Sequence, residues 1–207
     1  MIKSAYENYV LPKLLDTCCS TKPINYQRKK IVPNASGTVL EIGIGSGLNI
    51  PFYNISKIDK IYGLDPSIQL CKKAIKKAKE INMNIDFLFE GAEEIKLKSN
   101  SIDTVVITYT LCSIPNPMDA LKEIKRVMRS DANILFCEHG IAPDIKVSKW
   151  QNRINPIWGK LFGGCNINRD IPSIISNSGF KVQNLEQMYL PSTPKIVGYN
   201  YWGHACL

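Results

Sequence analysis

The chain has 207 residues, of which 44% are hydrophobic and 21% are charged. This length allows one sizeable core, and the ordinary composition argues against a disordered or membrane-spanning protein. The formal charge of +8 would suit a nucleic-acid partner. Much of that charge falls on the lysines of residues 72–79, which flank an apolar helical face. A solvated helix surface is the preferred explanation, and no nucleic-acid partner is expected.

Hydropathy and cysteine spacing set further limits. No apolar segment is long enough to cross a bilayer, and residues 1–8 lack the apolar core of a signal peptide. A cytoplasmic location is therefore expected. The seven cysteines and two histidines are scattered, with no Cys-x-x-Cys pair and no other zinc-site spacing. We expect free thiols and no metal.

The first predicted element is an amphipathic helix over residues 3–19, interrupted by Pro12. We expect this helix to pack on a sheet or to cover a ligand, and contact with a membrane surface is the alternative. A connector over residues 18–33 should then lead to the first strand.

The central feature is a predicted strand over residues 38–42 followed by glycines at alternate positions, Gly43, Gly45 and Gly47. Glycines permit positive φ and let the backbone approach a ligand, and the short helix predicted next would point free amides at it. The third glycine comes one position too early for a dinucleotide fingerprint, and the turn lacks the lysine of a phosphate-binding loop. Nicotinamide cofactors and nucleoside triphosphates are therefore disfavoured.

A second signal lies in register with the first. Asp65 ends a predicted strand over residues 60–64, about 20 residues past the glycines, where nucleoside-binding βαβ units place the carboxylate that contacts the ribose. Pro66 and Ser67 then begin a helix predicted to run to residue 80. We favour a ribose-binding role for Asp65 over a purely capping role.

Strands and helices continue to alternate along the rest of the chain. The alternation predicts a parallel sheet with right-handed crossovers, ligands bound outside the carboxyl ends of the strands, and a terminal hairpin. The further predicted strands span residues 84–89, 101–107, 132–137, 180–190 and 195–205, and the further predicted helices span residues 118–129 and 171–178.

The stretch from Glu41 to Gly47 resembles the Glu/Asp-x-Gly-x-Gly-x-Gly motif of class I S-adenosylmethionine-dependent methyltransferases. The resemblance implies an α/β, Rossmann-like fold with a seven-stranded, mostly parallel sheet in the order 3-2-1-4-5-7-6, helices on both faces and an antiparallel last strand. It also implies S-adenosyl-L-methionine as cofactor and S-adenosyl-L-homocysteine as product. The implied cofactor-binding residues are Glu41, Gly43, Gly45, Gly47, Asp65, Pro66, Ala92, Glu93 and Thr108.

The second half of the chain is similar to a narrower branch, the small methyltransferase-like 7 group and its bacterial relatives, whose animal members methylate alkyl thiols. The similarity implies a small-molecule acceptor, with a thiol as the favoured class. It rests on Leu111-Cys112-Ser113, Glu138-His139, Trp150-Gln151, Pro156-x-Trp158, Gly164-Cys165 and Arg169. The implied substrate-binding residues are Cys112, Trp150, Gln151, Trp158, Cys165 and Arg169.

The candidate catalytic residues stand at the end of the predicted strand over residues 132–137. His139 would act as a base or as the partner of an acceptor thiolate, and Glu138 would orient it or bind the cofactor. A structural histidine is the alternative, because neighbouring strand residues point to opposite faces. A phospholipid amine and a quinone ring carbon are alternative acceptors. A nicotinamide oxidoreductase and a non-catalytic cofactor- or RNA-binding module are the alternatives from other classes.

The predicted organisation is one domain. Two tryptophans, a proline and a glycine pair indicate a substrate-side insertion after the fifth strand. The predicted segments are an N-terminal helical cap (1–37), a cofactor-binding core (38–140), the insertion (141–170), and a C-terminal helix and hairpin (171–207).

Overall fold

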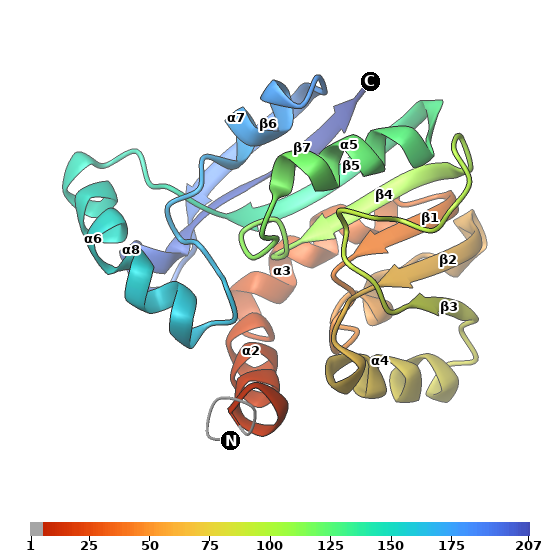
Figure 1. Cartoon of the computed structure of the whole chain (residues 1–207), viewed down its shortest axis with the longest axis horizontal. Coiled ribbons are helices and arrows are strands. Elements are labelled where there is room, and N and C mark those ends of the chain that lie inside the picture. The colour runs from red at the N-terminus through yellow and green to blue at the C-terminus, as the bar shows by residue number, and fades with distance from the viewer. Residues whose placement is uncertain (1–5) are drawn as a thin grey trace.

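The computed structural model describes residues 6–207, except the side chains of Glu7 and Asn8. Its centre is a sheet in the order β3-β2-β1-β4-β5-β7-β6 (Figure 1). Neighbouring strands are parallel except β7, which is antiparallel to both β5 and β6. The predicted fold class and strand order are confirmed. The strands are β1 (Gly37–Ile42), β2 (Ile58–Leu64), β3 (Ile85–Leu88), β4 (Ile102–Thr108), β5 (Met128–His139), β6 (Lys181–Tyr189) and β7 (Tyr199–Cys206).

Helices cover both faces of the sheet. One buried cluster joins the sheet to α3 and α4, and another joins it to α5 and α7. In Figure 1, α2 and α6 lie on the side of the sheet where the parallel strands end. The helices are α2 (Leu11–Cys19), α3 (Lys22–Ile31), α4 (Ile68–Glu80), α5 (Pro117–Val127), α6 (Ile145–Leu161), α7 (Ile171–Asn177) and α8 (Lys195–Gly198).

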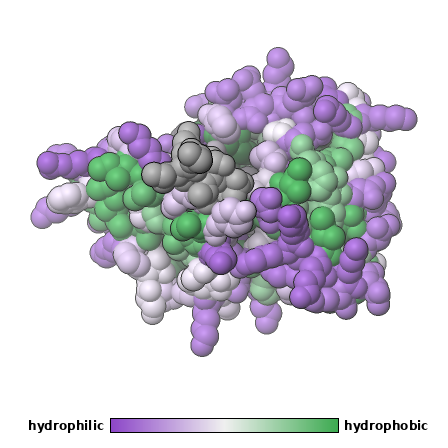
Figure 2. Space-filling view, turned by 60° about the horizontal axis from the view of Figure 1, so that its bottom comes forward, coloured by the Kyte–Doolittle hydropathy of each residue, from purple (hydrophilic) through white to green (hydrophobic). Residues whose placement is uncertain are grey.

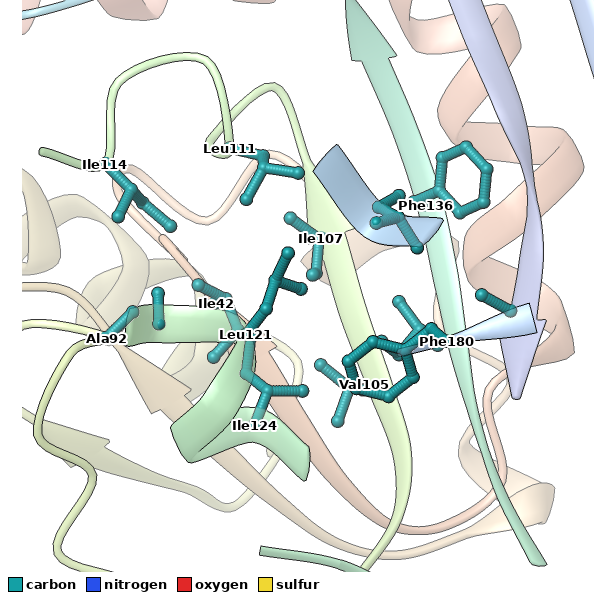
Figure 3. Close-up of a cluster of buried hydrophobic side chains, with 14 of the residues drawn as sticks. Ile42, Ala92, Val105, Ile107, Leu111, Ile114, Leu121, Ile124, Phe136 and Phe180 are labelled. Atoms are coloured by element: carbon teal, nitrogen blue, oxygen red, sulfur yellow. The ribbon is translucent and has the colours of Figure 1, made fainter. Parts of the chain in front are cut away.

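Strand β4 shows why the central strands are apolar at nearly every position. Val105 and Ile107 belong to the cluster beneath α5 and α7, whereas Val106 belongs to the cluster on the opposite face. Figure 3 shows the first cluster, in which Leu121 and Ile124 of α5 lie over the strand. Successive strand residues point to opposite faces, so a covered central strand needs apolar residues on both. Each fully buried aliphatic side chain contributes about 1.5–3 kcal/mol.

Two predictions for the first quarter of the chain are wrong. Residues 18–33, predicted as a connector, contain α3, with Pro23 in its first turn, where a missing N–H costs no helical hydrogen bond. The helix predicted after the glycine turn is only a 3-10 turn at Ile50–Phe52. The amides expected from a helix N-terminus are therefore not supplied there. Helix α3, which the sequence did not predict, lies beside the residues that follow the glycine turn.

Two further boundaries differ from the prediction. The last strand begins at Tyr199, because Lys195–Gly198 forms the short helix α8. Of the helix predicted over residues 3–19, residues 3–5 lie outside the described part. The remainder forms a π-helix at Tyr6–Val10 followed by α2, with Pro12 in its first turn.

The predicted insertion contains α6, whose outer face carries several apolar side chains among charged ones. Ile157 is 66% exposed and Leu161 50% exposed, and Figure 2 shows hydrophobic side chains gathered at the left, where α6 lies. The opposite face of α6 is turned to the sheet, where Gln151 is fully buried. Among residues 6–207, the helices that the structure defines are too short or too polar to cross a bilayer. Through its buried face, α6 covers the side of the sheet where the parallel strands end.

Candidate functional site

A cavity of about 480 Å³ lies at the carboxyl ends of the parallel strands, the usual place for ligands in such sheets. Its walls come from α2, α3, the glycine turn, the end of β4, the end of α6 and the segment before α8. Most of the wall is apolar, with a few polar groups between. The polar groups on the wall include Asp16, Arg28, Glu41, Ser46, Asn49, Asp65, Thr108, Thr110, Ser113, His139 and Asn200.

The three glycines of the turn all have positive φ, but for different reasons. A Cβ on Gly43 would lie 2.3 Å from the Thr110 side chain, and one on Gly47 would lie 2.9 Å from the Cα of Ala74. Both positions are glycine because neighbouring chain leaves no room. A Cβ on Gly45 would have Asp65 as its nearest neighbour, at an ordinary 3.7 Å. Gly45 is therefore the glycine whose open side faces the cavity.

Asp65 is 7% exposed and lies on the cavity wall next to this turn. Its Oδ2 accepts a hydrogen bond from Gly45 N (3.0 Å) and its Oδ1 accepts one from Ser67 N (2.8 Å). Burial raises the pKa of Asp65, and the two backbone donors act in the opposite direction. A carboxylate accepts about four hydrogen bonds. Asp65 therefore retains capacity for a ligand, and the helix cap is supplied by Ser67, whose Oγ accepts from Leu70 N.

A buried polar network stands behind the glycine turn. Glu41 accepts hydrogen bonds from Asn49 Nδ2 (2.9 Å) and from the Tyr53 hydroxyl (2.7 Å), and burial raises its pKa to about 7. Arg28 of α3 donates from Nε to Asn49 Oδ1 (3.0 Å) and lies over the Tyr109 ring at 4.9 Å. The network thus carries a guanidinium, 3% exposed, to the cavity wall.

Another part of the same cavity wall is formed by two thiols and an imidazole. The Sγ atoms of Cys112 and Cys165 are 3.7 Å apart, and Cys165 Sγ lies 3.2 Å from Nε2 of His139. The hydrogen bond from Cys112 and the neighbouring imidazole lower the pKa of Cys165 despite its burial. Burial by itself would lower the pKa of His139. The adjacent Cys165 acts in the opposite direction, and the pKa of His139 is raised. This arrangement favours a thiolate beside an imidazolium.

An apolar wall adjoins the thiols. Trp158 and Phe162 stack with ring centroids 3.9 Å apart, and both line the cavity. Val197 of α8 and Leu190 line it as well. One cavity therefore combines buried carboxylates, a guanidinium and a thiol–imidazole cluster, and this combination suits a polar ligand alongside a partly apolar one.

Comparison with known proteins identifies the family. Residues 40–136 match the model of the methyltransferase domain family. The chain is 29% identical to human thiol S-methyltransferase TMT1A over 84% of this chain and 72% of that protein. It is 30% identical to rat thiol S-methyltransferase TMT1B over 78% of this chain and 69% of that protein. The chain is a class I S-adenosylmethionine-dependent methyltransferase.

A solved structure shares the fold of this methyltransferase. The SAM-dependent methyltransferase from Aquifex aeolicus matches with a TM-score of 0.64 and 20% identity, covering 94% of this chain and 95% of the other.

The methyltransferase cavity contains five of the residues predicted to bind cofactor. They are Glu41, Gly43, Gly45, Asp65 and Thr108. Four others do not line it: Pro66 is exposed, Gly47 is buried against α4, Ala92 belongs to the core beneath α5, and Glu93 accepts a hydrogen bond from Asn116 N. The cofactor contact implied for Ala92 and Glu93 remains a prediction.

Glu138 does not take the position predicted for it. Its side chain is fully buried and Oε1 accepts hydrogen bonds from Thr110 N (2.6 Å) and Leu111 N (2.9 Å). Burial raises its pKa to about 7. Glu138 therefore neither orients the His139 ring by a hydrogen bond nor lines the cavity, but it holds the loop that carries Cys112.

Three residues predicted to bind substrate are also displaced from the cavity wall. Trp150 is 57% exposed on the outer side of α6. Arg169 donates to the backbone oxygens of Leu111 and Ile114 (2.8 Å for the latter), so it holds the same loop as Glu138. Arg169 is therefore part of a scaffold for the loop after β4, which is why its side chain does not reach the cavity.

Gln151 is the third predicted substrate residue that does not line the cavity, and its buried side chain connects several segments of the chain. Its Oε1 accepts from Ala142 N (2.8 Å), and its Nε2 lies within 3.0 Å of the backbone oxygens of Gly140, Ile167 and Ile196. Four segments meet at this amide. Its role is to join α6 to the end of β5 and to α8, and sequence pattern gives no signal for such a convergence.

Several residues on the wall were missed by sequence reasoning. Arg28 begins the run Arg28-Lys29-Lys30 within the residues predicted as a connector, and Asn49 lies where only a short helix is predicted. The other wall residues not predicted include Asp16, Cys19, Ser46, Tyr109, Thr110, Ser113, Phe162, Thr193, Val197 and Asn200. The Arg-Lys-Lys run was a weak signal for Arg28, since only its burial distinguishes it from the neighbouring lysines.

Proposed function

We propose that this methyltransferase transfers the methyl group of S-adenosyl-L-methionine to the sulfur of a small, partly apolar thiol. The observation that carries the proposal is that one cavity contains both the Gly45–Asp65 pair and the cluster of Cys112, His139 and Cys165. The similarity to proteins named thiol S-methyltransferases supports the choice of acceptor.

The residues of the first half of the cavity fit the cofactor. Asp65 has free acceptor capacity for the ribose hydroxyls, and Gly45 leaves the backbone open beside it. We assign Arg28 to the cofactor's carboxylate, because a buried guanidinium on the wall favours an anion. When bound, the cofactor supplies an electrophilic methyl group on a positively charged sulfur.

The residues of the second half suit a sulfur acceptor. The pKa of a free thiol is about 8.5, so an enzyme that methylates a thiol must stabilise the acceptor's thiolate near neutral pH. The His139 ring and the two cysteines form a polar, polarisable end to a mostly apolar space, while Trp158 and Phe162 exclude water beside it. Positioning in a dry site supplies much of the rate enhancement that such a transfer needs.

The test is product identification with a panel of acceptors. Purified protein is incubated with methyl-labelled cofactor and, separately, an alkyl thiol, a phosphatidylethanolamine dispersion and a quinol. The proposal predicts labelled thioether and stoichiometric S-adenosyl-L-homocysteine with the thiol, and background label elsewhere. Over about half its length the chain also matches a protein named phosphatidylethanolamine N-methyltransferase and one named for ubiquinone and menaquinone C-methylation. Turnover of the lipid amine or quinol in preference to every thiol would contradict the proposal.

A further inference from the structure

The three side chains at the thiol end of the cavity lie far apart in the sequence but converge in space. Cys112 follows β4, His139 ends β5, and Cys165 follows α6. One ligand atom from each lies within 4.8 Å of the other two. The sequence predicted no metal because these residues have no short spacing, and the fold supplies the convergence instead.

The separation of the two sulfur atoms fits a tetrahedral metal centre. With zinc bond lengths of about 2.3 Å to sulfur and about 2.0 Å to nitrogen, tetrahedral ligand atoms are separated by about 3.5–3.8 Å. The two Sγ atoms are 3.7 Å apart, as such a centre requires, and Cys165 Sγ is 3.2 Å from His139 Nε2, so these two atoms must separate by a few tenths of an ångström when an ion enters. The sulfur separation is also far longer than the about 2.05 Å of a disulfide bond, so both thiols are available as ligands.

The backbone holds the cluster independently of the thiols. Asn166 donates from its N (2.9 Å) and from Nδ2 (3.1 Å) to the backbone oxygen of Cys112, which ties the segment of Cys165 to the loop after β4. Glu138 and Arg169 hold that loop from the other side. A ligand set held in this way is already organised before an ion enters.

The chemistry of the ligands selects the ion. Two thiols and an imidazole suit a borderline-soft ion such as Zn²⁺, and they do not suit Mg²⁺ or Ca²⁺, which prefer oxygen. All three residues line the cavity, so the fourth tetrahedral position faces the space where an acceptor would lie. Three protein ligands with an open fourth position are typical of reactive rather than structural zinc sites.

We infer that Cys112, His139 and Cys165 form a binding site for Zn²⁺ or a similar thiophilic divalent ion, with an open position that takes the acceptor's sulfur. The last clause rests on the proposed function, whereas the ion site does not. The entering ion would displace the protons on the two sulfurs and on His139 Nε2 to solvent; an acceptor would then form a sulfur–metal bond and lose its S–H proton to solvent, and no electron changes hands. The ion would then hold the acceptor as a thiolate at neutral pH.

The experiment is a titration of the chelator-treated, phosphine-reduced full chain with Co²⁺, which reports zinc-type sites by its absorption. We expect one cobalt ion per chain, a thiolate-to-cobalt charge-transfer band and tetrahedral ligand-field bands. Adding Zn²⁺ should displace the cobalt and abolish both kinds of band. Cys112→Ser and Cys165→Ser should each weaken binding at least about 100-fold, since each removes a protein ligand and second-shell changes alone cost about 10–100-fold. Cys206→Ser, at the far end of β7, is the matched control and should bind as wild type.

Absence of the charge-transfer band in wild type, or its persistence in the Cys112→Ser/Cys165→Ser double variant, would overturn the ion site. Circular dichroism checks that each variant is folded, and the wild-type spectrum decides the question even where a variant is not. Adding an alkyl thiol to the cobalt-loaded protein should shift the ligand-field bands, and an unchanged spectrum would overturn the open position. If the protein binds the ion but methylates no thiol, only the proposed function is refuted. If the metal-free enzyme methylates thiols at the full rate, only the role of the ion is refuted.

Discussion

The two halves of the cavity are built in different ways. The proposed cofactor half is centred on β1, the glycine turn and the end of β2, which are consecutive in the chain, so Gly45 and Asp65 meet through one local unit, to which α3 adds Arg28. The acceptor half joins residues after β4, at the end of β5 and after α6. The comparison teaches that one half of the site is encoded locally, whereas the other exists only once distant segments have packed together.

The glycine turn offers the largest effect with which to test this division. Gly43→Ala should lower the free energy of unfolding by about 3–5 kcal/mol, because it adds left-handed strain and a clash with Thr110. Gly45→Ala meets no clash and should cost only about 1–2 kcal/mol, yet it should weaken cofactor binding. Urea denaturation and cofactor titration measure the two effects. Equal losses of stability would show that the two glycines do not differ in role.

Gln151 tests whether the acceptor half depends on tertiary convergence. Gln151→Ala removes a buried amide that serves four backbone groups, so we expect a loss of about 2–4 kcal/mol in urea denaturation. Activity of the folded variant should show a raised KM for the acceptor and an unchanged KM for the cofactor. Asn152→Ala, one position along the same helix, is the control and should stay near wild type. A normal acceptor KM would separate Gln151 from the acceptor half.

Glu138 gives a pH-dependent test of the loop that joins the halves. Its folded-state pKa is about 7, above its ordinary value of 4.5, so the folded protein binds more protons than the unfolded chain between these values. The stability due to this group is fully present below pH 4.5 and is lost as pH rises to about 7, by no more than about 3 kcal/mol.

The matched variant is Glu138→Gln, which keeps an oxygen to accept from Thr110 N and Leu111 N. Denaturation at a series of pH values should show a shallower decline than in wild type, with the remaining slope due partly to Glu41, whose pKa is also about 7. An identical slope in both proteins would mean that Glu138 does not titrate in this range.

Trp150 marks the smallest expected effect. Because this side chain is 57% exposed on the outer side of α6, Trp150→Ala should change stability by no more than about 0.5 kcal/mol and leave both KM values unaltered. Trp158→Ala, on the cavity wall of the same helix, should instead raise the acceptor KM. Steady-state kinetics compares the acceptor KM of the two variants. A larger increase in Trp150→Ala than in Trp158→Ala would indicate that Trp150 belongs to the acceptor site.

The same division explains what sequence could predict. The glycine turn and Asp65 follow from short-range spacing, since a strand, a turn and the next strand end constrain one another, whereas the sheet order follows from the resemblance to class I methyltransferases. Helix α3 could not be predicted because Lys22–Ile31 has few apolar residues and buries polar ones, and its buried Arg28 is indistinguishable in sequence from its basic neighbours. The resemblance to the methyltransferase-like 7 group assigns Gln151 and Arg169 to the substrate. Their hydrogen bonds to backbone atoms of distant segments appear only in the fold.

The most direct test of the central claim is calorimetric titration with S-adenosyl-L-homocysteine of wild type, Asp65→Asn and the Cys112→Ser/Cys165→Ser double variant. The account predicts that Asp65→Asn weakens binding by about 100-fold, equivalent to about 3 kcal/mol. The double variant should bind within about threefold of wild type. Asp86→Asn, an exposed aspartate paired with Lys60 on the outer strands, is the control. Wild-type affinity in Asp65→Asn, or an equal loss in both site variants, would contradict the division of the cavity into a cofactor half and an acceptor half.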